Sequence, residues 1–187
     1  MGDPILFFYG TLMTPQILHR VIHGQADPEP WQKALLTIKP AILHNYRRHR
    51  VQGADYPGIV PVSEGDDTGA ESRPSVLGTV VWGLTDGDVF RLDRFEGSEY
   101  EKRVVRVRVL DGDGDEGKGK GGGEGEEERV RGLLLDAAEG ATEGKEVEAV
   151  TYVWTAGEER LEAAEWDFEA FKRDKLAWWV GADEEYA

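Results

Sequence analysis

The chain has 187 residues, a formal net charge of −15 and no cysteine. This length suits one domain with a hydrophobic core, and six Trp, six Tyr and six Phe can fill it. The acidic charge argues against binding to nucleic acids or to anionic membranes. The lack of cysteine excludes disulfides, a thiol nucleophile and thiolate metal ligands, and it fits a reducing compartment. No apolar run approaches the length needed to span a membrane, and the start lacks signal-peptide features, so we expect a cytoplasmic protein.

The first elements are predicted from a short apolar run and the turn residues that follow it. Residues 5–9 read Ile-Leu-Phe-Phe-Tyr, which predicts a strand buried on both faces. Residues 10–13 form the expected exit loop. Thr14, Pro15 and Gly24 are residue types expected at the N-cap, the first turn and the end of a helix. The chain therefore opens as strand, glycine turn and helix.

The central part predicts several strands and one further helix. Lys102 to Leu110 alternates valine with arginine, which is typical of a strand with one face in solvent. Pro40 should mark an edge or a break in its segment. Thr85 and its neighbours can cap a helix that carries Glu96. Strands are expected at residues 59–62, 76–84, 102–110, 129–135 and 149–155, and residues 31–43 are expected to be strand or extended structure.

Residues 111–128 hold eight Gly, eight acidic residues and two Lys in 18 positions, with no apolar side chain. Such a segment cannot bury enough surface to order itself, so we predict a disordered insertion in a hairpin between the strand that ends at Leu110 and the strand at 129–135. A second acidic loop is expected at 136–145. Helical spacing after residue 157 predicts a C-terminal helical extension over about 157–187. The sum is a single α+β domain over 1–187, whose mostly antiparallel mixed sheet curls toward a small barrel flanked by a few helices.

Two groups of residues resemble metal sites without completing one. Asp111, Asp113 and Asp115 begin like an EF-hand loop, but its glycine and its final glutamate are missing. His19 and His23 lie one helical turn apart, opposite the apolar stripe of their helix, with no third ligand nearby. We expect the two histidines on exposed helix surface, and no metal or organic cofactor. The basic run at residues 47–50 either balances surface charge or anchors a substrate carboxylate.

Glu96 is the most informative single residue. On the expected helix it points within about 20° of Val89 and about 40° of Leu92, both core-facing. A carboxyl group held among apolar side chains has a raised pKa, which suits acid/base chemistry near neutral pH. The alternative is that Glu96 turns to solvent or pairs with Arg94, Lys102 or Arg103, since glutamate is rarely fully buried.

A second candidate feature is the glycine turn Tyr9-Gly10-Thr11-Leu12. A glycine turn between a buried strand and a helix can aim several backbone N–H groups at one point and so hold an anion or an oxyanion. Many strands end in glycine, so this pattern alone identifies nothing.

Together these features resemble a known family. Phe8-Tyr9-Gly10-Thr11-Leu12 is similar to the signature loop of the gamma-glutamylcyclotransferase-like superfamily, and Leu92-Asp93-Arg94-Phe95-Glu96-Gly97, followed by Tyr100 and Arg103, resembles its second signature. The middle strands around Tyr56-Pro57-Gly58 also look similar. Within the superfamily, the chain most resembles the plant and fungal avirulence-induced-gene-like proteins and the gamma-glutamylamine cyclotransferases. Glutathione-directed members carry Ser-Asn where this chain has Thr11-Leu12.

The resemblance implies a barrel with a cavity at one end and Glu96 as the catalytic acid/base. It implies that the loop from Tyr9 to Leu12 binds the glutamyl part of a small-molecule substrate, with Tyr56 and Tyr100 as further substrate-binding residues. The implied enzyme is a transferase or lyase that releases 5-oxoproline and a free amine. Two alternatives stay open: a related hydrolase or acyl-transfer enzyme acting on a secondary metabolite, and a non-catalytic protein that binds a small molecule in the same cavity. The oligomeric state is not predicted.

Overall fold

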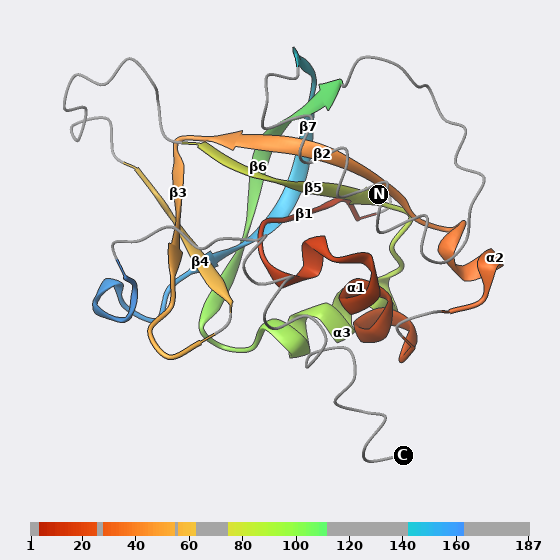
Figure 1. The fold of residues 1–187 in the computed structure, drawn as a ribbon, viewed down its shortest axis with the longest axis horizontal. Helices are drawn as coiled ribbons and strands as arrows, with labels where there is room; N and C mark the ends of the chain where they lie inside the picture. Colours follow the sequence, from red (N-terminus) through yellow and green to blue (C-terminus); the bar gives the residue numbers. More distant parts are fainter. Residues whose placement is uncertain (1–3, 26–27, 55, 63–74, 112–141, 163–187) are drawn as a thin grey trace.

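A computed structural model describes residues 4–25, 28–54, 56–62, 75–111 and 142–162. Its centre is a closed five-stranded barrel with strand order β1-β5-β2-β6-β7 (Figure 1). All neighbouring strands are antiparallel except β1 and β7, which close the barrel as a parallel pair. The expected α+β fold with a mixed, mostly antiparallel barrel is confirmed. The barrel strands are β1 (Leu6–Phe8), β2 (Thr37–His44), β5 (Ser75–Trp82), β6 (Tyr100–Asp111) and β7 (Thr142–Trp154).

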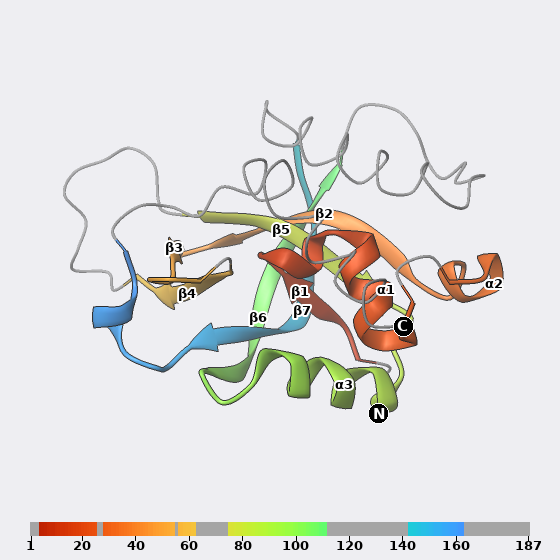
Figure 2. The same cartoon turned by 60° about the horizontal axis from the view of Figure 1, so that its bottom comes forward.

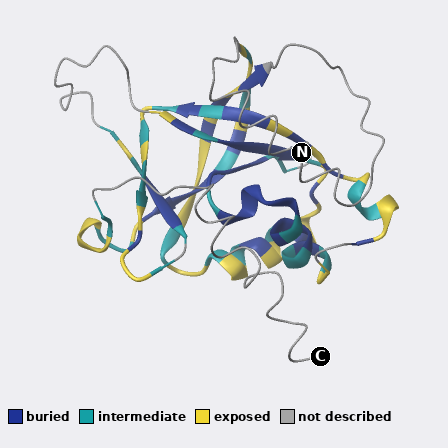
Figure 3. Cartoon of the chain, in the orientation of Figure 1, coloured by how far each residue is buried: buried dark blue, intermediate teal, exposed yellow. Residues whose placement is uncertain are grey.

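Strand β1 is buried along its whole length, as its apolar sequence predicts (Figure 3). Successive side chains of a strand point to opposite faces, so β1 contributes to two separate cores. Phe7 packs inside the barrel with residues such as Val80 and Val107. Leu6 and Phe8 pack on the other side, against the helices. The start of the chain thus joins the barrel interior to the helical layer.

Two helices cover this outer side of the barrel. Helix α1 (Pro15–His23) follows the one-turn helix η1 (Thr11–Met13), and α3 (Asp86–Glu96) packs against α1 (Figure 2). Gly24 ends α1 with a φ of 76°, in the left-handed region that favours glycine. Thr14 precedes α1 as predicted, but its hydroxyl makes no capping hydrogen bond. Among the described residues, no helix is long and apolar enough to cross a bilayer.

Two strands lie outside the barrel sheet. Strands β3 (Tyr46–Arg50) and β4 (Pro57–Pro61) form a separate two-stranded antiparallel sheet. Gly58 of β4 fits closely against Trp154 of β7, where an added Cβ would lie 3.0 Å from the Trp154 Cβ. This contact brings the beginning of β4 to the end of β7. A one-turn helix, η3 (Glu158–Arg160), follows β7.

The alternation predicted for residues 102–110 is confirmed in β6. Val105, Val107 and Val109 are buried, whereas Arg106 and Arg108 are exposed. The two arginines approach Glu146 on β7, each with a nitrogen–oxygen distance of 3.6 Å. The solvent-exposed face of this strand pair therefore carries neighbouring side chains of opposite charge.

Two expectations from the sequence are wrong, and a third, for Pro40, holds in part. The segment 31–43 is not one strand, because the short helix α2 (Pro30–Lys33) precedes β2; Pro30 opens this helix, and the Glu29 N–H donates to Gln32 Oε1 at 2.9 Å. Pro40 does not break β2; it pairs with Thr79 of β5 and lies just outside the stretch of β2 that pairs with β6, which covers Ala41 and Ile42. The antiparallel partner of residues 100–111 is β7, which takes in residues 142–145 of the predicted acidic loop.

His19 is also placed differently from the prediction. It is only 1% exposed and stacks on His23, with 5.5 Å between the ring centroids. Helix α3 packs along α1, and Arg91 Nε donates to the Ile22 carbonyl at 2.9 Å. A single apolar stripe in α1 does not reveal this second contact.

Some predictions fall outside the described residues. These are the strand at 129–135, the disordered state of residues 112–128 and most of the C-terminal extension. Within the described part of that extension, residues 158–160 form η3, and Leu161 pairs as an isolated bridge with Val51.

Candidate active site

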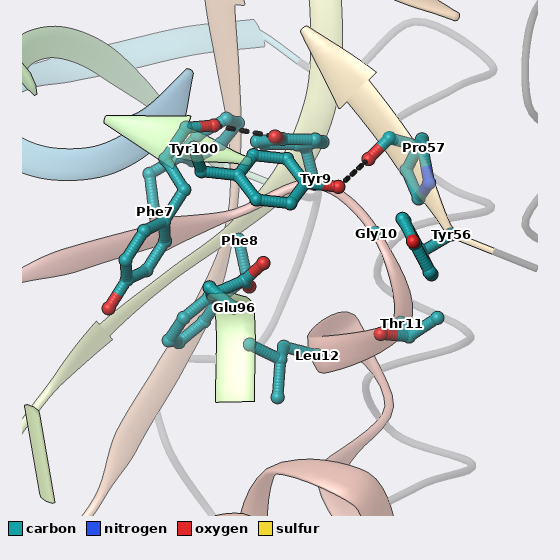
Figure 4. Close-up of a pocket in the computed structure, with 11 residues that line it drawn as sticks. Phe7, Phe8, Tyr9, Gly10, Thr11, Leu12, Tyr56, Pro57, Glu96 and Tyr100 are labelled. Carbon is teal, nitrogen blue, oxygen red and sulfur yellow. Dashed lines mark hydrogen bonds between the residues drawn. The ribbon is translucent and has the colours of Figure 1, made fainter. Parts of the chain in front are cut away.

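All seven residues that the sequence singled out line the same pocket (Figure 4). The pocket encloses about 300 Å³, part of it open to solvent, and lies where the end of β1, the end of α3 and the beginnings of β4 and β6 meet. Four further residues complete its wall. The lining residues are Phe7, Phe8, Tyr9, Gly10, Thr11, Leu12, Tyr56, Pro57, Glu96, Tyr100 and Tyr152.

Helix α3 places Glu96 at the pocket. The helix starts with a capping box in which the Asp88 N–H donates to Thr85 Oγ1 and the Thr85 N–H donates to Asp88 Oδ2. Glu96 is its last residue, and Gly97 follows with a φ of 80°, which lets the chain turn toward β6. The helix is anchored by Leu92, which is fully buried. Glu96 is therefore held by a helix that is fixed at both ends.

The Glu96 carboxyl has the electrostatic properties of an acid/base group. Burial in the pocket, followed by the negative charge of Asp93, raises its pKa from 4.5 to about 8. The residue as a whole is half-buried, and it lines the pocket. Of the three cations considered as its alternative partners, Lys102 and Arg103 pair instead with Asp93 and Glu101, and the Arg94 guanidinium lies over the Phe90 ring.

The Tyr9–Leu12 loop forms the opposite wall. The N–H groups of Thr11 and Leu12 open helix η1 and so have no acceptor within it. Gly10 packs so closely on Pro57 that an added Cβ would lie 2.8 Å from the proline Cδ. Glycine is needed here for space, because a side chain would collide with the Pro57 ring.

Arg48 fixes this loop from β3. Its Nη1 donates to the Tyr9 carbonyl at 2.9 Å and to the Leu77 carbonyl at 3.1 Å. The basic run at residues 47–50 therefore supplies a structural clamp, and none of its four side chains lines the pocket. Arg50 pairs with Glu162.

Four tyrosines line the pocket, and the hydroxyl of each donates a hydrogen bond to another residue of the protein. Tyr9 donates to the Tyr152 carbonyl, Tyr100 to the Pro57 carbonyl, Tyr56 to Glu99 Oε1 and Tyr152 to Asp93 Oδ1. Burial raises the pKa of all four phenols above the ordinary value, and the negative charge of Glu96 contributes in each case. The phenols therefore remain protonated near neutral pH, which leaves Glu96 as the group in this pocket whose pKa is shifted into that range.

Tyr152 and Asp93 belong to this arrangement but were missed in the sequence, where Lys102 was considered only as a partner of Glu96. Asp93 Oδ1 accepts from the Tyr152 hydroxyl at 2.8 Å, and Asp93 Oδ2 accepts from Lys102 Nζ at 2.9 Å. Asp93 lies inside the second signature motif, which was the available signal. Tyr152 comes from a strand 59 residues away, and nothing local in the sequence connects it to the motif.

The described residues include no group of three or more His, Asp or Glu side chains that could hold a metal ion. The pocket offers one carboxyl group whose pKa is raised to about 8, a turn whose first backbone N–H groups have no acceptor within helix η1, and a wall of aromatic rings. Such a site suits proton transfer on a small molecule that carries an anionic group.

Barrel and pocket define a protein of the gamma-glutamylcyclotransferase fold. The model of the family "Gamma-glutamyl cyclotransferase, AIG2-like" matches residues 6–120, more than half of the chain, and the chain belongs to this family. The Arabidopsis thaliana proteins named Protein AIG2 C and AIG2-like protein C are 25% and 27% identical to it over 167 and 168 residues. These alignments cover 89% and 90% of this chain and 71% and 69% of the relatives.

Two solved structures share the fold. Both are solution structures of Arabidopsis thaliana proteins, with TM-scores of 0.55 and 0.52 and sequence identities of 21% and 22%. Each covers all of this chain, and the chain covers 82% and 91% of the two proteins. The expected superfamily and its AIG2-like branch are thus confirmed, and the similarity to these structures supports the fold alone.

Proposed function

We propose that this protein is a gamma-glutamylcyclotransferase that releases 5-oxoproline and a free amine from a small γ-glutamyl compound. The observation that carries the proposal is the position of Glu96. Its carboxyl, with a pKa raised to about 8, shares one pocket with the Tyr9–Leu12 loop. Membership of the family supports the same reaction class.

In the proposed reaction, the substrate's own α-amine attacks its γ-carbonyl carbon. A carbon–nitrogen bond forms and closes a five-membered lactam, while the bond from that carbon to the leaving amine breaks. Glu96 accepts a proton from the attacking amine and returns a proton to the departing one. Since attack is internal, substrate connectivity removes much of the entropic barrier, and the protein needs to orient the chain and handle one proton.

The hydrogen-bond donors and acceptors of the pocket favour one orientation of the glutamyl group. Backbone N–H groups of the loop from Gly10 to Leu12 are donors, so they suit the α-carboxylate or the developing oxyanion. The four tyrosine hydroxyls already donate elsewhere, so their rings and oxygen lone pairs are what they offer a ligand. In this proposal Tyr9, Tyr56 and Tyr100 flank the substrate, and its amine lies toward Glu96.

The first test is Glu96→Gln, with Glu101→Gln as the control. Glu101 is an exposed carboxylate on the neighbouring strand, paired with Arg103. Both proteins would be incubated with γ-glutamyl-lysine isopeptide, γ-glutamyl dipeptides and glutathione, and 5-oxoproline would be measured by mass spectrometry. Loss of the acid/base should lower kcat roughly 10²- to 10⁴-fold for Glu96→Gln, while Glu101→Gln stays near the wild type.

Two results would reject the proposal. If Glu96→Gln, shown to be folded by circular dichroism, retains activity within a few-fold, Glu96 is not the acid/base. If the wild-type protein forms no 5-oxoproline from any compound of the panel, the reaction is not this cyclisation. We also propose that the enzyme acts in the cytoplasm and needs no cofactor.

A further inference from the structure

The Asp93 carboxylate lies between the pocket and a lysine on the next strand. It is one helical turn before Glu96, so the two side chains lie on neighbouring parts of the α3 surface. The hydroxyl of Tyr152, which lines the pocket, donates a hydrogen bond to one Asp93 carboxylate oxygen, and Lys102 Nζ donates to the other. Asp93 is thus fixed at both oxygens by side chains from β7 and β6.

We propose that Asp93 is a positioning residue whose fixed negative charge keeps the Glu96 carboxyl protonated until substrate enters, and that Lys102 limits this effect. For its catalytic meaning this inference rests on the proposed function. Two carboxylates one turn apart repel each other, which favours the neutral form of the more buried one. The Asp93 carboxylate has a lysine partner and a phenol donor, which hold it in place beside Glu96.

The groups that face Glu96 come from every element around the pocket. They are Asp93 on its own helix, Tyr9 after β1, Tyr56 before β4, Tyr100 on β6 and Tyr152 on β7. The four phenols stay neutral, so Asp93 is the negative charge among these groups. Lys102 reaches Asp93, and the ion pair connects β6 to the helix.

This arrangement has a chemical use in the proposed reaction. A γ-glutamyl substrate brings its own cationic ammonium group into the pocket. A neutral Glu96 avoids an unpaired negative charge in the empty pocket, and the arriving cation favours transfer of the Glu96 proton to solvent through the open side of the pocket. The Glu96 carboxylate is then formed beside the amine from which it must accept a proton.

The test uses two substitutions with opposite expected effects. Asp93→Asn removes the negative charge while its amide oxygen can still accept from Tyr152, so the Glu96 pKa should fall by roughly one pH unit. Lys102→Gln leaves Asp93 without its cation, so the Glu96 pKa should rise. Arg106→Gln is the matched control: it removes the same charge from the same strand but from the partner of Glu146, and should leave Glu96 unchanged.

The pKa of Glu96 would be measured directly by carbon-13 NMR titration of its side-chain carboxyl, assigned with Glu96→Gln. The acidic limb of the kcat/KM profile with the best γ-glutamyl substrate should shift in the same directions. A purely structural role of Asp93 would lower stability without moving these midpoints in opposite directions. Equal midpoints in the wild type, Asp93→Asn and Lys102→Gln would overturn the inference.

The NMR result also separates this inference from the proposed function. If no γ-glutamyl compound is converted but the midpoints shift as described, the electrostatic role of Asp93 holds and the reaction assignment fails. If turnover is seen and the midpoints do not move, the reaction assignment holds and the role of Asp93 fails. Should Asp93→Asn not fold, Lys102→Gln alone still gives the upward shift or its absence.

Discussion

At the scale of single residues, the raised pKa of Glu96 affects stability as well as chemistry. The folded protein holds the Glu96 proton with a pKa of about 8, whereas the unfolded chain has the ordinary value of 4.5. The folded state therefore binds this proton more tightly. The resulting stabilisation is complete below about pH 4.5 and is lost as the pH rises to about 8.

We therefore expect Glu96→Gln to change the pH dependence of stability. Between about pH 5 and pH 8, the wild type should lose on the order of 3 kcal/mol of unfolding free energy relative to Glu96→Gln. Urea denaturation of both proteins at a series of pH values measures this difference. Parallel stability curves for the two proteins would contradict the raised pKa, whatever the activity assay shows.

At this scale, helical periodicity indicated the direction in which Glu96 points, but it gave no sign of the contacts of Asp93. Helical periodicity turned Glu96 toward apolar neighbours, and the structure brings its carboxyl to the pocket wall. The importance of Asp93 depends on Tyr152 and Lys102, which reach it from two other strands. Periodicity describes one helix at a time, so it cannot show which strands lie beside it.

At the scale of elements, the loop between β1 and α1 depends on how closely it packs on β4. Gly10→Ala would bring a methyl carbon to 2.8 Å from the Pro57 Cδ, well inside contact distance. The loop or the start of β4 must then shift, so kcat/KM should fall and unfolding free energy should drop by about 1–3 kcal/mol.

Gly87→Ala is the matched control for the loop substitution. Gly87 lies in the first turn of α3, and an added Cβ would meet its nearest atoms only at 3.7 Å. Since alanine favours helix, stability should stay the same or rise by up to about 1 kcal/mol. Steady-state kinetics and thermal denaturation would compare both variants. Equal effects of the two substitutions would show that the contact with Pro57 does not matter.

Elements with local sequence signals were predicted better than those set by distant contacts. The glycine turn, helix α1 and the capped helix α3 follow from residues within a few positions of each other. Helix α2 interrupts a segment that reads as extended, because Pro30 and the Glu29–Gln32 pairing outweigh the apolar pattern. The partner of β6 could not be chosen from alternation alone, which gives the face of a strand but not its neighbour.

At the scale of the whole molecule, the barrel closes where β1 meets β7. The paired segment is short, with Leu6 opposite Val150 and a hydrogen bond of 2.8 Å from the Val150 N–H to the Ile5 carbonyl. The side chain of Thr151 adds to this seam, since its fully buried hydroxyl donates to the Phe7 carbonyl at 3.0 Å.

We expect Thr151→Val to weaken barrel closure. The substitution keeps the shape of the side chain but leaves the buried Phe7 carbonyl without this donor, which costs about 1–3 kcal/mol. Thr155→Val is the control, because the Thr155 hydroxyl donates to the Glu99 carbonyl at an exposed position and its loss should cost less than about 1 kcal/mol. Chemical denaturation would compare the two, and similar losses would contradict a special role for the seam.

Strand β1 also determines how the pocket can open. Its side chains fill the barrel interior on one face and the helical layer on the other, and the pocket loop follows directly after it. Fluctuations that release β1 would therefore break both cores together. The amides of β1 should exchange with solvent only through global unfolding, and the pocket wall that it carries has no independent local unfolding step.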